Sequence, residues 1–122
     1  MSSLDFRLTS AQLADGSYVV TVGGEVDTLA APALEHELEK RSHDSRSLIV
    51  DLLEVSFVES AVLGVLLKAA RRLRTRGGEL VLVADNVGVL RAFDVTGLTG
   101  QFRLERSLAT AIERSLAQAY RP

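Results

Sequence analysis

The sequence predicts a single α/β domain built on a mixed, mainly parallel β-sheet. The chain has 122 residues, which is the size of one domain. Its composition, 47% apolar and 25% charged, is typical of a soluble globular protein. After an opening pair of strands, segments with strand and helix periodicity alternate, which favours parallel strands joined by right-handed crossovers. The predicted order is β-β-α-β-α-β-α-β-α, and no linker divides residues 1–122.

The first two strands form a predicted hairpin. Polar neighbours alternate with Leu4, Phe6 and Leu8, and again with Tyr18, Val20 and Val22. Asp15 and Gly16 lie between these runs and can supply the positive φ of a tight turn. The Gly23-Gly24 pair indicates a bend or bulge at the end of the second strand.

A helix and a central strand are predicted next. Pro32 suits a first helical turn, and Leu34 and Leu38 lie on one face of a helix that ends near "RSHDSR". The run "SLIVDLL" at residues 47–53 is short, apolar and bounded by polar residues. This pattern is typical of a strand covered on both faces, so we predict that it is the central strand.

The second half of the chain repeats this alternation. A helix is predicted from about Ala61 to Arg76, because apolar residues recur there at helical spacing and Gly77-Gly78 can end it. "ELVLVA" at residues 79–84 predicts a buried strand. "DNVGVLRAFDVTG" predicts a helix with an Asp or Asn cap and an apolar face of Val87, Leu90 and Phe93. "QFRLE" predicts a short strand, and Ser107 caps a last helix.

Sequence features of an enzyme are weak. The chain has no cysteine, which excludes thiol nucleophiles and zinc-thiolate sites. "VGGEVD" lacks the spacing of a dinucleotide loop, and no phosphate-loop pattern occurs. His36 and His43 have no recognisable catalytic or metal-binding partner, so we interpret them as surface residues. We therefore predict no catalytic residues, no metal site and no cofactor.

Nucleic acid and membrane partners are also not indicated. The net charge is −2, and the basic stretch "KAARRLRTR" contains no aromatic residues that could stack on bases. Cations toward a helix C-terminus are stabilised by the helix dipole, which is the simpler interpretation of this stretch. The N-terminus does not resemble a secretory signal, and no run approaches the ~20 apolar residues of a membrane span. We therefore expect a cytoplasmic protein without direct membrane insertion.

The stretch "SFVESAVLGVLL" at residues 56–67 allows two interpretations. It places Glu59 and Ser60 directly before an amphipathic helix, whose free N–H groups and dipole could hold a phosphoryl group. Ser60 and Glu59 could equally be an ordinary cap and a favourable dipole contact. Spacing alone favours the cap.

Three segments together resemble the STAS family, the bacterial anti-sigma factor antagonists. They are "VGGEVDTLAAPALEHEL", "LIVDLLEVSFVESAVLGVLLKAARRLRTRGGELVLV" and "VLRAFDVTGL", and they cover almost the whole chain. The family motif G-E-hydrophobic-D corresponds to Gly24, Glu25, Val26 and Asp27. The strand motif hydrophobic-hydrophobic-Asp-Leu corresponds to Ile49, Val50, Asp51 and Leu52. The late motif F-D-x-x-G-L corresponds to Phe93, Asp94, Gly97 and Leu98. The resemblance implies the same order of elements.

The resemblance also implies a switch site before the second helix. The family's signature resembles D-S-[ST]-G-hydrophobic-G, in which the partner anti-sigma factor, a kinase, phosphorylates the second hydroxyl residue. In this chain the acceptor position is Ala61, which has no oxygen to receive a phosphoryl group. Ser60 is expected to remain a cap, and Val62 to add an apolar side chain to the docking surface. The implied partner-binding and switch residues are Asp27, Glu59, Ser60, Ala61, Val62, Leu63 and Gly64.

The resemblance implies a non-enzymatic binding module. It would dock a serine-kinase-type anti-sigma factor through residues from Glu59 to about Leu73 and so release a sigma factor. The alternative is a STAS structural subunit of a membrane transport or scaffold assembly, which needs no phosphorylation cycle. A third function, nucleotide binding or hydrolysis, lacks a recognisable phosphate loop. Homodimer formation and the identity of the sigma factor stay open.

Overall fold

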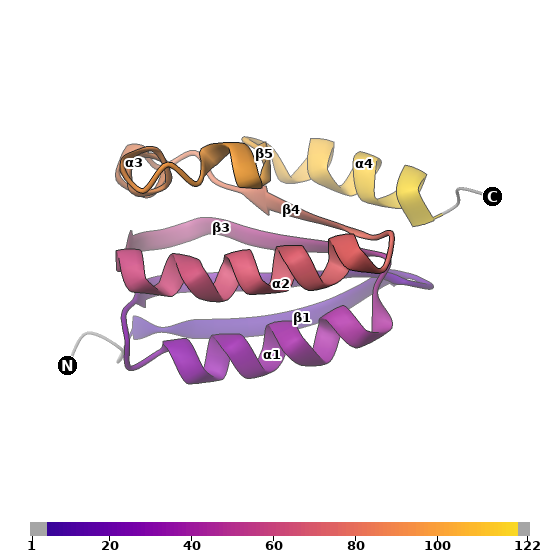
Figure 1. Ribbon diagram of the computed structural model, residues 1–122, viewed down its shortest axis with the longest axis horizontal. Coiled ribbons are helices and arrows are strands. Elements are labelled where there is room, and N and C mark those ends of the chain that lie inside the picture. The colour runs from indigo at the N-terminus through magenta and orange to yellow at the C-terminus, as the bar shows by residue number, and fades with distance from the viewer. Residues whose placement is uncertain (1–4, 120–122) are drawn as a thin grey trace.

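A computed structural model of the chain describes residues 5–119 and contains one five-stranded sheet in these residues. Figure 1 shows its layers. The strands are β1 (Arg7–Ala14), β2 (Ser17–Val26), β3 (Ser47–Val58), β4 (Glu79–Val83) and β5 (Arg103–Glu105). The helices are α1 (Ala31–Asp44), α2 (Leu63–Thr75), α3 (Val87–Val95) and α4 (Leu108–Ala119), with 3₁₀ turns η2 (Ser60–Val62) and η3 (Thr99–Gln101). β1 pairs antiparallel with β2, and the other pairs are parallel, which confirms the predicted fold class and element order.

The sheet separates two apolar cores, and β3 is its central strand as predicted. The larger core packs α1, α2 and α3 against one side of the sheet and includes Leu48 and Val50 of β3. The smaller core lies beneath α4 and includes Ile49 of the same strand together with Ala111. Adjacent β3 residues therefore enter opposite cores, which explains why the strand is apolar without alternation.

The predicted bulge in β2 is confirmed. The pairing of β2 with β3 shifts register between Thr21 and Gly23 and again between Gly24 and Glu25. Gly24 has φ +82°, and a Cβ atom there would lie 2.2 Å from the Asp5 carbonyl oxygen, so this position requires glycine. The strand continues past the bulge to Val26, and β3 likewise extends beyond the predicted residues 47–53.

The predicted helix ends are largely correct. The Asn86 side chain accepts hydrogen bonds from the N–H groups of Gly88 and Val89 and caps α3. Ser107 Oγ accepts from the Thr110 N–H at 3.3 Å at the start of α4. Gly77 has φ +78°, and the Gly78 N–H donates to the Leu73 carbonyl at 2.8 Å, which ends α2. The hairpin differs in its start, because β1 begins only at Arg7, and Leu4 lies outside the described residues.

The basic stretch at the end of α2 holds neighbouring elements together. The Arg76 guanidinium donates to the Ser42 and His43 carbonyls at 2.8 Å each, at the C-terminal end of α1. Arg74 donates to the Gln101 carbonyl at 2.9 Å, and Lys68 pairs with Glu35 at 3.0 Å. These contacts support the structural interpretation of the cations. His36 and His43 are exposed, as predicted.

Three buried serines join α4 to the sheet. Ser115 Oγ lies 2.6 Å from Ser17 Oγ and 2.8 Å from Ser47 Oγ. All three residues are fully buried. Because each hydroxyl has a partner, the polar atoms inside the interface of α4 with β2 and β3 are satisfied.

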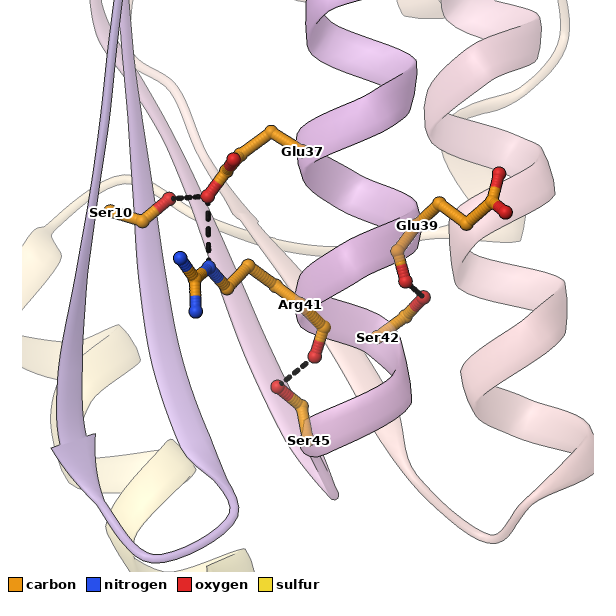
Figure 2. Close-up of polar contacts among 6 residues, drawn as sticks. All are labelled: Ser10, Glu37, Glu39, Arg41, Ser42 and Ser45. Carbon is orange, nitrogen blue, oxygen red and sulfur yellow. Dashed lines mark hydrogen bonds and ion pairs between the residues drawn. The ribbon is translucent and has the colours of Figure 1, made fainter.

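A second polar cluster joins α1 to the hairpin (Figure 2). The Ser10 hydroxyl of β1 donates to the Glu37 carboxylate of α1, and Arg41 Nε donates to the same carboxylate oxygen at 2.8 Å. The Arg41 guanidinium carbon also lies 5.1 Å from the centre of the Tyr18 ring. These two hydrogen bonds, the one from Ser10 first, hold the pKa of Glu37 below its usual value.

The Glu37→Gln variant is expected to lose about 1 kcal/mol of unfolding free energy at pH 7, because the charge-assisted hydrogen bonds are lost. A lowered pKa stabilises the fold above the unfolded-state value of about 4.3. The difference between wild type and variant should therefore shrink as pH falls from about 4.3 through the lowered pKa. Urea unfolding at several pH values measures this difference in the free energy of unfolding. Glu39→Gln, at an exposed site on the same helix, is the control and should leave the free energy of unfolding at pH 7 nearly unchanged. A difference between wild type and Glu37→Gln that is equal at every pH would contradict the assignment.

Candidate partner-binding site

The seven predicted site residues come together at the C-terminal ends of β2 and β3. The Glu59 N–H donates to the Val26 carbonyl at 2.9 Å, which joins the loop after β3 to the loop after β2. Asp27 directly follows Val26, and residues 60–64 form η2 and the start of α2. α1 and α2 begin at this end of the molecule, and α3 is seen end-on at the same end, above β3 in the view (Figure 1).

Asp27 shapes the loop that leads into α1. Its side chain is 5% exposed, and Oδ1 accepts hydrogen bonds from the N–H groups of Leu29 and Ala30 at 3.1 Å each. Its backbone carbonyl accepts from the N–H groups of Ala30 and Ala31. The carboxylate therefore orders the turn before α1, which includes the backbone of the exposed residue Leu29.

The prediction that Ser60 is a helix cap is wrong. Ser60 lies inside η2, and its side chain makes no capping hydrogen bond. The 3₁₀ turn instead uses backbone groups: the Val62 N–H donates to the Glu59 carbonyl at 2.8 Å, and the Leu63 N–H donates to the Ser60 carbonyl. Because α2 begins only at Leu63, the Ser60 hydroxyl is too early in the chain to cap it. Ser60 and Ala61 are both exposed.

The prediction that Val62 adds an apolar side chain to the docking surface is also wrong. Val62 is 1% exposed and Leu63 is fully buried, and both belong to the larger core. The 3₁₀ turn points these two side chains inward, while Ser60, Ala61 and Gly64 face the solvent. A Cβ atom on Gly64 would meet nothing within 4 Å, so the surface above the first turn of α2 is open.

Large exposed apolar side chains gather at the same end of the molecule. Within residues 5–119 they are Leu29, Phe57, Val87 and Val95, with exposures of 70%, 49%, 68% and 79%. Leu29 follows β2, Phe57 is near the end of β3, and the two valines begin and end α3. Val87 was expected on the buried face of its helix and is instead exposed, because it occupies the first position of α3. Such clustering is typical of an interaction surface.

A groove of about 300 Å³ lies between the end of β3 and α3. It is lined by residues 56–58 of β3 and by residues of α3 that include Arg91 and Val95, with Ser60 at its edge. The groove therefore adjoins the predicted switch residues. Sequence reasoning missed Phe57, Arg91 and Val95, because the pattern around them indicates only a strand end and an amphipathic helix.

Two kinds of feature are absent from the described part of the chain. No group of three or more His, Cys, Asp or Glu side chains there could hold a metal ion. None of its helices combines the length and apolar character that crossing a bilayer requires.

Comparison with known proteins decides the family. The family model of the STAS domain matches residues 9–111. The chain belongs to the STAS domain family. This STAS domain is 38% identical over 81 residues to the anti-sigma-B factor antagonist of Listeria monocytogenes, and the matched part covers 66% of this chain and 71% of that relative.

Solved structures agree with this family. A crystal structure of an anti-sigma factor antagonist from Mycobacterium paratuberculosis has a TM-score of 0.82 and 30% sequence identity, and the match covers 91% of this chain and 94% of that one. A sulfate transporter family protein from Wolinella succinogenes shares the fold alone, with a TM-score of 0.75 and 15% identity, over 87% of this STAS domain and 89% of that chain.

Proposed function

We propose that this STAS domain is an anti-sigma factor antagonist that binds a serine-kinase-type anti-sigma factor. The observation that carries the proposal is the position of the exposed apolar side chains. Leu29, Phe57, Val87 and Val95 lie at the same end of the molecule as the loop of residues 59–64. A partner that covers this end would bury apolar area that water now contacts, which is the main source of association energy.

We further propose that the partner cannot switch this surface off by phosphorylation at residue 61. Ala61 is exposed in η2, where a kinase could reach it, but its methyl group accepts no phosphoryl group. Binding would then be constitutive, because no added negative charge can repel the partner at this position. In this proposal the domain performs no catalysis itself, acts in the cytoplasm and controls the availability of a sigma factor.

The transport or scaffold subunit is the weaker candidate. Its support is the fold shared with the Wolinella succinogenes protein at 15% identity, and a fold alone does not determine function. Two relatives that are at least 30% identical, from Listeria monocytogenes and Mycobacterium paratuberculosis, are antagonists of anti-sigma factors. The two functions predict different partners in a pull-down from the source cells: an anti-sigma kinase or the subunits of a transporter.

Gly64→Arg is expected to weaken binding to the cognate anti-sigma factor by about 30-fold or more, because the long side chain would stand on the open surface above α2. The fold should be unaffected, since Gly64 is exposed and arginine favours a helix. Calorimetric titration against each serine-kinase-type anti-sigma factor of the source genome measures the effect.

The matched control is Ala109→Arg, which places the same side chain on an exposed position of α4 and should leave the affinity unchanged. Failure of every such anti-sigma factor to bind the wild-type chain, together with recovery of transporter subunits only, would overturn the proposed function.

A further inference from the structure

We propose that the groove between β3 and α3 receives an apolar side chain from a basic segment of the partner. The proposal rests on the proposed function and specifies the chemistry of the bound segment: a leucine, isoleucine or phenylalanine flanked by lysine or arginine. The shape of the groove, the exposure of its lining and the charges near it each support this proposal.

The groove is shaped and lined for an apolar side chain. Its lining includes Phe57 of β3 and Val95 of α3, and two other α3 residues in the lining, Gly88 and Ala92, are small. The volume of about 300 Å³ is at the small end of ligand pockets, which suits an anchoring side chain rather than a large ligand. Such anchors commonly dominate the affinity of an interface.

Three unpaired carboxylates neighbour residues of this groove in the chain or in the sheet. Glu25 lies opposite Phe57 in the β2–β3 pairing, Glu59 follows the lining residue Val58, and Asp85 precedes α3 by two residues. Within residues 5–119 none of these three side chains has a hydrogen bond or ion pair. By contrast, the glutamates that pack between other elements are paired, for example Glu35 with Lys68 and Glu79 with Arg103.

The charge balance decides what flanks the apolar side chain. Three unpaired carboxylates neighbour residues of the groove, against the single guanidinium of Arg91 in its lining. A cationic partner segment would therefore meet a complementary potential, whereas an acidic segment would meet repulsion from most directions. Arg91 restricts the cations to positions outside the groove itself, while its methylene groups can cover the bound side chain.

The test uses two short peptides with blocked ends that differ only in charge. Both contain a pair of leucines, flanked by lysines in one peptide and by glutamates in the other. In titrations followed by ¹H–¹⁵N spectra, the lysine peptide should shift the amides of residues 56–60 and 87–96. We expect it to bind the wild-type chain about tenfold more tightly than the glutamate peptide, with an affinity that falls as salt is added.

Two variants separate the apolar and the charged contributions. Val95→Ser removes a groove wall from a position that is 79% exposed, so folding should be unaffected while the lysine peptide loses about fivefold or more in affinity. Glu59→Gln combined with Asp85→Asn should reduce the difference in affinity between the two peptides, and it should also reduce the salt dependence of that difference. Equal binding of both peptides, shifts that lie elsewhere, or concentration-dependent self-association through these residues would overturn the proposal.

The same variants distinguish this proposal from the proposed function. An anti-sigma factor whose binding is weakened by Gly64→Arg but not by Val95→Ser would overturn the groove proposal and support the proposed function. Binding of the lysine peptide in the groove, without binding of any anti-sigma factor to the wild-type chain, would overturn the proposed function and support the groove chemistry.

Discussion

Ala61→Ser is expected to become phosphorylated by a serine-kinase-type anti-sigma factor and ATP, whereas the wild-type chain stays unmodified at this position. The substitution adds the missing oxygen at an exposed residue of η2, directly before α2. Backbone N–H groups at the start of α2 and its positive dipole end lie close enough in sequence to favour the added charge. Intact-mass spectrometry followed by peptide mapping measures the modified fraction, which we expect to be partial.

Ser60 provides the internal control for this experiment. Ser60 and Ala61 are both exposed, and Ser60 does not use its hydroxyl for capping, so exposure does not distinguish the two positions. The direction of the side chains distinguishes residues 60 and 61, because adjacent residues of a helical turn point to different sides. The double variant Ser60→Ala/Ala61→Ser should therefore be phosphorylated to the same extent as the single variant Ala61→Ser. High-occupancy phosphorylation of Ser60 in the wild-type chain would contradict the prediction and identify a displaced acceptor.

The charge of a phosphoryl group can also be imitated without a kinase. Ala61→Asp places a carboxylate at the proposed interface, where a buried and unmatched charge costs on the order of 1 to 3 kcal/mol of binding free energy. Calorimetry with the anti-sigma factor measures this cost, and Ala61→Asn, which has nearly the same shape without the charge, is the control. An unchanged affinity for Ala61→Asp would place residue 61 outside the interface.

The sequence predicted the scaffold well because its elements carry local signals. The apolar run in β3, the left-handed glycine at Gly77 and the Asn86 cap each depend on neighbouring residues, and the structure confirms them. Family resemblance singled out the loop of residues 59–64, which lies beside Asp27 at the C-terminal ends of β2 and β3. These signals fix where the chain turns and which faces are buried.

The details of the site depend on contacts that local patterns do not report. A 3₁₀ turn between β3 and α2 changes which residues face inward, so the expected roles of Ser60 and Val62 were wrong. The groove forms only because α3 packs near the end of β3, and these residues are some thirty positions apart in the sequence. Ser115 is a polar residue on a helix surface in sequence terms, yet it is fully buried because Ser17 and Ser47 satisfy its hydroxyl.

Val62→Gly, which would bring the chain closer to the family signature, is expected to lower the free energy of unfolding by about 2 to 4 kcal/mol. Val62 is 1% exposed in the larger core, so the change removes buried methyl groups and leaves a cavity. Glycine also increases the conformational freedom of the unfolded chain, which adds to the loss. Urea unfolding measures the change.

Gly64→Ala is the matched control for this substitution, two residues further along the chain. Gly64 is exposed in α2 and has open space around its missing Cβ, so alanine should stabilise the protein by about 0.5 to 1 kcal/mol. A cost below about 1 kcal/mol for Val62→Gly would mean that the core tolerates the lost volume. If the expected cost is found while the folded variant still binds the anti-sigma factor normally, the valine acts through core packing. The substitution of glycine by valine would then stabilise the switch loop without altering the surface that a partner contacts.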